Sequence, residues 1–599
     1  MCKIIGKYIK ILEIVFLTFF FAISFDLFSQ TNSDSLSTET TRRNLTRRLL
    51  DMITVSALDS LNYATINKVS EEHFITYSGM KIRNIEVQRL NVFGSNINNP
   101  EKISNVNQIT NILNKTHVNT IERIIRNNLL FKTGDAISPL TLSDNERILR
   151  ELSYINDARI FVVPVSEEEA NIIVVTKDIY SIGFDVSLSE LKKGNFAVFD
   201  RNLIGLGHSI EFDMPFDFEE TPNHFGFGFI YSVNNISHSF IDFKTFYVNG
   251  LGKKTYGFNI NRPLVAYSTK YAGGISLGRM HTTEDLDTMA VAYPLSYALQ
   301  DYWLLRSFPL NSSSVKRLII GARYYNNNIF ERPFIFEDSY HSLQKYSVFL
   351  WSISYSRQQY YKTNLIYAYG RTEDIPFGAL VRVTAGKEIN EFGNRSYFGF
   401  DASTGRSILG LGYFYAGMAV GGYWSENEIE QGVISTNINH FTNLITLGKY
   451  RMRNFVNLNY VRGVNRFTDE YLNFASENGF AGFRNDTIRG SQRFSAGVES
   501  ALFCPSELWG FKFVVYGFAD MGLLKGTNVF LSHNFNLTSV GLGLRVRNEN
   551  LVFPTLQIRL AYFPSQPEFS RINNAVLSGE QLFRHPNFVP ERPAVIQYR

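Results

Sequence analysis

Apolar and polar residues alternate one by one in two runs near the end of the chain. From Ser539 to Arg547, every second residue is Val or Leu, and the residues between them are Ser, Gly or Arg. From Leu556 to Phe563, Leu, Ile and Tyr alternate with Gln, Arg, Ala and Phe. Successive side chains of a strand point to opposite faces, so each run predicts a strand with one apolar face. Such strands suit a soluble sandwich, with the apolar face inward, or a transmembrane barrel, with the apolar face toward lipid.

The same alternation recurs from about residue 190 onward. Runs at 209–217, 256–261 and 456–460 carry it, and stretches rich in Asn, Ser, Glu and Gly separate them. In a sandwich the Glu and Asp of these runs would face a core, whereas in a membrane barrel they line the lumen. About 400 residues, at roughly 26 per strand and connection, predict approximately 16 strands, and bacterial barrels have even counts. We therefore predict a membrane β fold, an approximately 16-stranded antiparallel transmembrane barrel over residues 190–599.

The sequence pattern identifies the first and last strands of this barrel less clearly. Residues 208–217 are expected to form the first strand. The last strand is either 556–563 or 593–599, because Pro567, Pro586, Pro590 and Pro593 indicate an irregular connection between the two. The sequence leaves both alternatives open.

Residues 80–180 carry a different pattern. A strand pattern covers 82–92, helical apolar faces cover 116–130 and 142–152, and strand patterns at 158–165 and 170–176 flank a turn of three glutamates. The order strand-helix-helix-strand-strand predicts a small α+β (β-α-α-β-β) domain with both helices on one face of the sheet.

The first thirty residues predict export. Lys3, Lys7 and Lys10 precede the apolar stretch 11–24, and a polar segment follows. This arrangement is typical of a secretory signal peptide (1–30), and an uncleaved anchor is disfavoured because the stretch is short and contains Glu13. Residues 31–79 are expected to be a periplasmic helical or linker segment, whose apolar residues between 45 and 61 predict a helix that leans on the next domain or lies on the membrane surface. No later apolar run is long enough for a spanning helix, so the exported chain fits the bacterial outer membrane.

Composition narrows the range of partners. Aromatic residues make up 15% of the chain and charged residues 19%, a balance that suits barrel strands and their interface girdles. The net charge of +4, without a basic cluster, argues against a nucleic-acid partner. Cys504 is the single thiol outside the expected signal peptide, so no internal disulfide is expected.

Several strings resemble known motifs. Gly134-Asp135 and Tyr154-Ile155-Asn156-Asp157 stand in the order found in POTRA domains. The strings at 201–207 (Arg-Asn-Leu-Ile-Gly-Leu-Gly), 518–522 (Phe-Ala-Asp-Met-Gly) and 541–545 (Gly-Leu-Gly-Leu-Arg) resemble the start of the first strand, the lumen-strand motif and the penultimate strand of the BamA/TamA superfamily. These are outer-membrane assembly and secretion factors with a C-terminal surface-antigen-type barrel, and the resemblance covers nearly everything after residue 80.

The resemblance also implies a lumen loop that folds into the barrel and meets the lumen-strand motif. The family's Arg-Gly-aromatic motif corresponds by spacing to Ala481-Gly482-Phe483, so its arginine is missing here. Either Arg484 or Arg489 is then the cation for Asp520, and the sequence does not decide between them. The candidate residues are Gly482, Phe483, Arg484, Arg489 and Gly490 for the loop, and Phe518, Asp520 and Gly522 for the strand.

A member of this superfamily would insert or translocate other polypeptides at the outer membrane of a diderm bacterium, with its POTRA-like domain in the periplasm. Its partners would be outer-membrane lipid, unfolded or exported client polypeptides, and periplasmic accessory proteins. The edge for a client strand is expected at 170–176, including Ile172 and Val174, because an extended chain can add to an open sheet edge. A weakly paired seam between the first and last barrel strands would open sideways. The alternative is a passive channel or a lipid-handling barrel with the same architecture.

No enzyme activity, cofactor or metal site is expected. Residues 274–278 match a hydrolase elbow pattern, but they continue a strand pattern and no helix pattern follows. His281 and Glu284 lie close in sequence, and two such residues in a loop do not make a metal site.

Overall fold

The computed structural model describes residues 69–97, 99–103, 108–190, 192–219, 224–284, 293–310, 315–474, 480, 482–484, 488–526, 534–553, 555–564, 571–572, 574–579 and 587–599. The expected signal peptide and the helical pattern at 45–61 lie outside these residues. Among the described residues, no helix is both long enough and apolar enough to cross a membrane.

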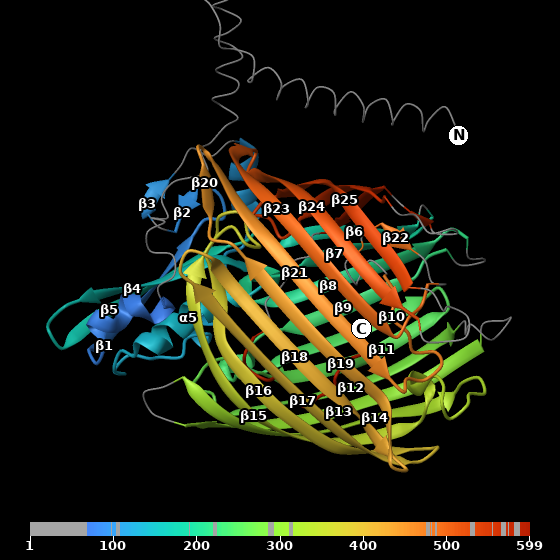
Figure 1. Ribbon diagram of the computed structural model, residues 1–599. Helices are drawn as coiled ribbons and strands as arrows, with labels where there is room; N and C mark the ends of the chain where they lie inside the picture. Colours follow the sequence, from blue (N-terminus) through green and yellow to red (C-terminus); the bar gives the residue numbers. More distant parts are fainter. Residues whose placement is uncertain are drawn as a thin grey trace, which may run out of the picture. The chain divides into compact units, whose positions relative to one another are not determined.

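A small α+β domain precedes the barrel (Figure 1). Its sheet has the order β1-β5-β4, in which β5 (Glu169–Asp178) pairs parallel with β1 (Lys81–Leu90) and antiparallel with β4 (Ile155–Pro164). The 3-10 helix η2 (Ser70–Tyr77) precedes β1. After β1 come β2 (Ser95–Asn96), β3 (Asn99–Ile103) and α3 (Gln108–Thr116). The helices α4 (Glu122–Asn127) and α5 (Pro139–Glu151) complete the expected β-α-α-β-β order, with α3 and a short β-hairpin inserted after β1.

Local sequence explains the bounds of these helices. Pro139 occupies the first turn of α5, and the Ser138 hydroxyl accepts a hydrogen bond from the Thr141 N–H (3.4 Å). The helix expected over 116–130 is shorter, because both the backbone N–H and the hydroxyl of Thr120 bond to Asp178 (2.7 and 2.8 Å) and Ile121 is extended. Leu142 and Leu149 of α5 then pack on the sheet in one buried apolar cluster.

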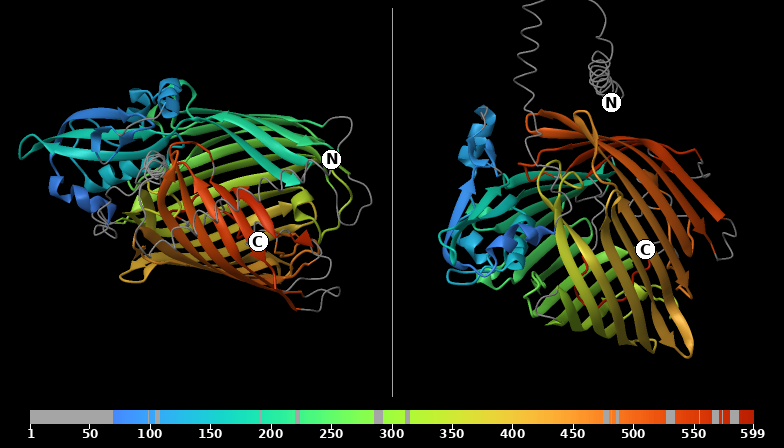
Figure 2. Two further views of the ribbon diagram at one scale, coloured as in Figure 1. Left: turned by 90° about the horizontal axis from the view of Figure 1, so that it is seen from above. Right: turned by 60° about the vertical axis from the view of Figure 1, so that its left-hand side comes forward.

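The rest of the chain forms a closed antiparallel barrel (Figures 1 and 2). Its strands in chain order are β6 (Ile182–Glu190), β7 (Lys193–Asp200), β8 (His208–Asp217), β9 (Phe227–Val233), β10 (Asp242–Gly250), β11 (Lys253–Arg262), β12 (Tyr271–Glu284), β13 (Tyr293–Pro309), β14 (Lys316–Glu331), β15 (Tyr346–Thr363), β16 (Glu373–Asn390), β17 (Asn394–Ile408), β18 (Gly412–Ser425), β19 (Glu428–Phe441), β20 (Ile445–Leu447), β21 (Tyr450–Val464), β23 (Gln492–Leu508), β24 (Phe511–Lys525), β25 (Asn534–Arg547), β26 (Leu556–Tyr562) and β28 (Ala575–Gly579). A separate small sheet pairs β22 (Phe483–Arg484) with β27 (Arg571–Ile572).

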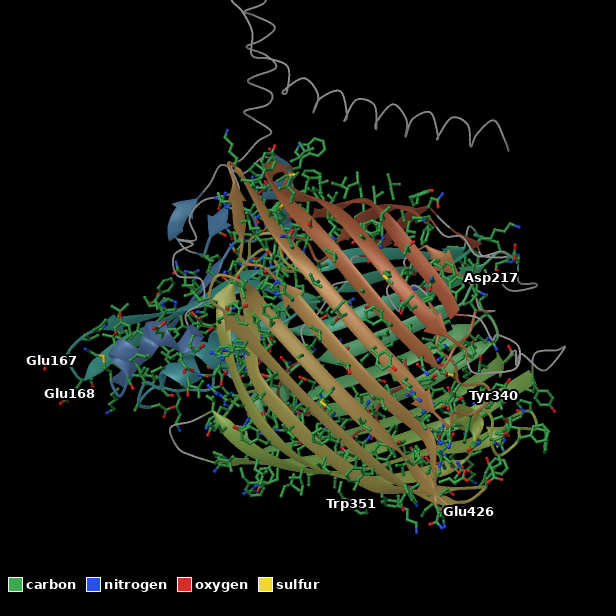
Figure 3. The ribbon with its side chains drawn as sticks, viewed as in Figure 1. Glu167, Glu168, Asp217, Tyr340, Trp351 and Glu426 are labelled. Carbon is green, nitrogen blue, oxygen red and sulfur yellow. The ribbon has the colours of Figure 1, made fainter. Side chains whose placement is uncertain are left out.

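The outer face of the wall is apolar, as the alternation predicts. Leu542 and Tyr562 are 63% and 64% exposed, whereas Gln557 and Phe563 are 4% and 1% exposed on the inner side. Trp351 also lies on the outer surface (Figure 3). A closed sheet with its apolar side chains outward is a transmembrane barrel, so the predicted fold class is confirmed.

The strand count and the two ends of the barrel differ from the prediction. Within the described residues the ring contains twenty-one strands, including the three-residue β20, against the approximately 16 expected. The estimate was low because β6 to β11 are only seven to ten residues long, so that each strand with its connection takes far fewer than 26 residues.

The first strand is β6 and the last is β28, so 208–217 is the third strand of the ring. The run 556–563 corresponds to the strand before the last, and 593–599 is not part of the ring. Residues 587–599 instead lie in the lumen, where Ile596 and Tyr598 pack against its largest buried cluster (Figure 2). We call residues 587–599 the lumen segment.

Candidate functional site

The lumen-strand motif lies on β24, and its alternate residues face the lumen. Phe518 is 7% exposed, and Asp520 is partly buried beside it. The carboxylate of Asp520 accepts hydrogen bonds from Arg559 of β26 and from the Ser539 hydroxyl of β25 (3.1 Å). The Arg559 guanidinium also stacks on the Phe518 ring, 3.5 Å from its centroid. Among the described side chains, the hydrogen-bond partners of Asp520 thus belong to the barrel wall, and Arg559 is its cation.

A second cluster centred on an arginine lies on the same wall. Arg545 of β25 donates to Glu499 of β23 (Nη2 to Oε2, 2.7 Å) and to Gln557 of β26 (2.8 Å). Its guanidinium lies 4.0 Å from the centroid of the Tyr516 ring. The first cluster therefore links β24 to β26 and the second links β23 to β26, each through one arginine stacked on an aromatic ring, which fixes the register of these strands.

The lumen loop reaches the lumen-strand motif through aromatic side chains. Phe483 is fully buried, and a Cβ added at Gly522 would lie 2.5 Å from the Phe474 ring and 2.8 Å from the Phe480 ring. Because Gly522 has no side chain, it leaves room on β24 into which the loop packs. Gly482 has φ +93°, a conformation that favours glycine before Phe483.

Of the two candidate arginines of this loop, the structure describes the side chain of Arg489. Arg489 stacks on Tyr471, 4.0 Å from the ring centroid, and the side chain of Arg484 lies outside the described side chains. Gly490 bonds to Leu472 in both directions (2.9 and 2.7 Å) and packs against Leu524, which closes the base of the loop.

The glycine-rich string at 201–207 connects β7 to β8 and docks the α+β domain. Asn202 donates to the Thr120 hydroxyl (2.9 Å), and Thr120 in turn bonds Asp178. A Cβ at Gly205 would lie 2.5 Å from the backbone oxygen of Asn119, and one at Gly207 would lie 2.8 Å from the Tyr154 hydroxyl. Only glycine allows this close approach, so the string holds the domain and does not begin the first strand.

Charged residues of α5 make a second contact with the barrel. Arg150 binds Asp374 of β16 through two hydrogen bonds (both 2.8 Å), and Glu146 pairs with Lys362 of β15. Burial alone would raise the pKa of Glu146, but the cations of Lys362 and Arg150 hold it below its usual value. Burial beside Lys512 lowers the pKa of Lys177, on β5, to about 8.

The expected client edge is wrong. Ile172 and Val174 lie on β5, which is the central strand of its sheet, and both are fully buried. The reason is the parallel pairing of β1 with β5, which places β1 and β4 at the edges. On β1, the outer side of the backbone already forms hydrogen bonds at Ile82, with Asp135 and Gly134 (both 2.9 Å), and at Ile85, with Arg126 (2.9 Å).

The remaining candidate chemistry lies in β12. Residues 274–278, His281 and Glu284 all belong to this strand, and 273–281 pair in register with β11. Among the described residues, no group of three or more His, Cys, Asp or Glu could hold a metal ion.

Comparison with known proteins gives similar folds at low identity. No family model matches the chain, and no curated protein matches it. The crystal structure of BamA from Haemophilus ducreyi lacking POTRA domains 1–3 aligns with 83% of this chain and 84% of its own, at 11% identity and a TM-score of 0.35. CdiB from Escherichia coli aligns with 91% of this chain and 98% of its own, at 11% identity and a TM-score of 0.38. The siderophore receptor PirA from Pseudomonas aeruginosa aligns with 68% of this chain and 83% of its own, at 9% identity and a TM-score of 0.30.

At these values the alignments carry no argument about activity. The architecture rests on the strand pairing: a β-α-α-β-β domain followed by a closed antiparallel barrel with a loop packed inside. The resemblance of its motifs to those of the BamA/TamA superfamily stays a prediction.

Proposed function

We propose that this protein inserts or translocates other polypeptides at the outer membrane of a diderm bacterium. The observation that carries the proposal is the way the barrel closes. The closing strand β28 has five residues, and it lies between β26 with seven and β6 with nine. On the opposite wall, β15 and β16 have eighteen residues each and pair over their full length.

A short closing strand makes few backbone hydrogen bonds, so separating β28 from β6 breaks fewer of them than separating any long pair. The freed edge of β6 would then offer unpaired N–H and C=O groups to a client strand. The edge of β1 beyond Ile85 would offer a second such site, on the POTRA-like domain that the proposal places in the periplasm. Strand addition of this kind reads the backbone and needs no fixed client sequence.

Locking the seam tests the proposal. In a Cys504→Ser background, a cysteine at Ala575 of β28 is combined in turn with cysteines along β6, and the pair that oxidises is retained. We expect the oxidised protein to lose insertion or secretion activity and to recover it on reduction. The matched control is Ser352→Cys with Thr384→Cys, two lumen-side residues that face each other on β15 and β16. Activity retained in the locked seam contradicts the proposal.

Depletion of the protein separates the possible activities. General loss of outer-membrane barrel proteins supports insertion, and loss of one exported substrate supports secretion. Normal levels of both favour the passive channel or lipid-handling barrel, and conductance of the purified protein in planar bilayers then distinguishes these two.

A further inference from the structure

The lumen segment lies against a wall that is shaped for it. Four glycines from four different strands mark places where a wall side chain would collide with the segment. A Cβ at Gly405 would lie 2.5 Å from the Phe588 ring, and a Cβ at Gly463 would lie 2.8 Å from the Tyr598 ring. At Gly321 and Gly421, the Cβ would lie 3.0 Å from Pro593 and 3.1 Å from Ile596. These glycines belong to β14, β17, β18 and β21, so the segment crosses a broad part of the wall.

The wall also binds the backbone of the segment. The Ser356 hydroxyl donates to the carbonyl of Phe588 (2.6 Å), and the side-chain oxygen of Gln358 accepts the Phe588 N–H. Further along, Arg323 donates to the Pro593 carbonyl (3.0 Å) and the Tyr397 hydroxyl accepts the Ile596 N–H (2.8 Å). Contacts to backbone groups at both ends are typical of the recognition of an extended peptide.

A charged cluster fixes the middle of the segment. Arg592 pairs with Asp301 of β13, and the same carboxylate receives two hydrogen bonds from Arg323 (2.7 and 2.9 Å). Asp301 therefore holds one arginine of the wall and one of the segment. The side chain of Arg592 remains 44% exposed, so this pair is accessible to water.

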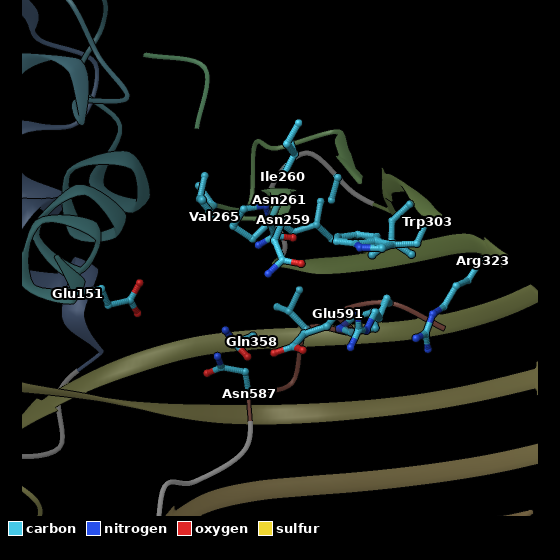
Figure 4. A pocket seen from close by; sticks show the side chains of 18 of the residues that line it. Glu151, Asn259, Ile260, Asn261, Val265, Trp303, Arg323, Gln358, Asn587 and Glu591 are labelled. Carbon is cyan, nitrogen blue, oxygen red and sulfur yellow. The ribbon is translucent and has the colours of Figure 1, made fainter. Parts of the chain in front are cut away.

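The first half of the segment borders a cavity of about 850 Å³ (Figure 4). Asn587 and Glu591 line it from the segment, and Trp303 and Asn259 line it from the wall. This half of the segment is thus anchored to the wall and also borders open space. It also makes no strand pairing with the wall among the described residues.

We propose that the lumen wall between β13 and β21 is a binding site for an extended polypeptide segment, and that residues 587–599 are its resident, displaceable occupant. The site takes aromatic side chains at the positions of Gly405 and Gly463 and a cation at Asp301. While occupied, it narrows the lumen; when the segment leaves, the barrel conducts. This inference concerns ligand binding and permeability, and it does not require the proposed function.

The test compares the full chain with a chain lacking residues 587–599 in planar bilayers. We expect the deleted form to conduct ions about tenfold more than the full chain, because a barrel of this strand number encloses an aqueous channel. A synthetic peptide with the sequence of 587–599 should lower this conductance saturably, and a scrambled peptide should not. A folded deletion variant that conducts no more than the full chain, or that ignores the peptide, overturns the proposal.

Two full-length variants test the same proposal if the deletion variant does not fold. Gly463→Ala puts a methyl group where the Tyr598 ring lies and also crowds the Arg466 side chain, whereas Gly517→Ala on β24 has no neighbour within 3.4 Å. We expect Gly463→Ala to raise conductance above Gly517→Ala, with both migrating as folded barrels on unheated gels. Equal conductance of these two folded variants contradicts the proposal.

Discussion

The barrel has two unlike walls. From β12 to β25, the strands of the ring other than β20 have 14 to 18 residues, whereas β26, β28 and β6 to β11 have five to ten. A tilted strand needs about 9–11 residues to cross a bilayer, so the long wall exceeds this length and parts of the short wall fall below it. The bilayer must thin beside the short wall, at a modest cost for each ångström of mismatch. The seam between β28 and β6 therefore lies where the fewest backbone hydrogen bonds join neighbouring strands and where we expect the bilayer to be thinnest.

The largest effect is expected where an arginine ties the short wall to the long one. Arg559→Ala removes the pairing cation of the partly buried Asp520, which should cost about 3–5 kcal/mol of barrel stability. Urea unfolding in detergent micelles measures it. The double variant Asp520→Asn with Arg559→Gln should recover part of the loss, because it leaves no buried carboxylate without its cation. An unchanged unfolding midpoint in Arg559→Ala would show that this pair does not hold the walls together.

A matched pair of valines compares the membrane beside each wall. Val383 lies mid-strand on β16 and Val186 mid-strand on β6, and both side chains are exposed on the outer face. Arginine at a bilayer midplane costs about 2–4 kcal/mol and much less near an interface, so Val383→Arg should cost more than Val186→Arg. Folding into lipid vesicles, followed by gel mobility against urea, gives both values. Equal costs at the two positions would argue against a thinned bilayer at the short wall.

The docking of the α+β domain on the short wall predicts a smaller effect. Thr120→Val removes the hydroxyl that joins Asn202 to Asp178 and leaves these two groups buried, which should cost about 1–3 kcal/mol. Limited proteolysis should then cut the domain faster while the barrel keeps its mobility. Thr141→Val, in the half-buried first turn of α5, is the control.

The smallest effect concerns pH. The pKa of Glu146 is held below 4.5 in the folded protein by Lys362 and Arg150, so its contribution to docking is complete above 4.5 and disappears as the pH falls through the lowered pKa. Proteolysis of the domain should therefore accelerate below pH 4.5 in the native protein. Asp157, in the same interface, has a pKa raised by burial and acts in the opposite sense. Glu146→Gln should remove the acid-dependent loss, and an identical pH profile in this variant would contradict the assignment.

The sequence predicts what depends on local alternation and misses what depends on distant pairing. The apolar faces of β25 and β26 could be predicted because every second residue there is aliphatic or aromatic. β28 was missed because five residues carry too few alternations. β6 does alternate, with Ile182, Phe184, Val186 and Leu188 on one face, and it was missed because it directly follows the strands of the α+β domain. The central position of β5 depends on a parallel partner nearly 90 residues earlier in the chain.

The candidate site follows the same division. Asp520 stands out in the sequence through its motif, whereas Arg559 was visible only as one of several cations on a polar strand face. The pairing of the two needs β24 and β26 to be next-but-one neighbours in the ring, which no local pattern gives. The lumen segment has no regular periodicity, and its prolines indicated only an irregular connection.

The most direct test of the account places a photo-crosslinking amino acid at Val186 on the short wall or at Val383 on the long wall, in cells that are actively exporting polypeptides. Both positions face outward, so lipid reaches them equally. We expect polypeptide adducts at Val186 and none at Val383. Polypeptide adducts at neither position, or equal adducts at both, would contradict a seam that opens to clients.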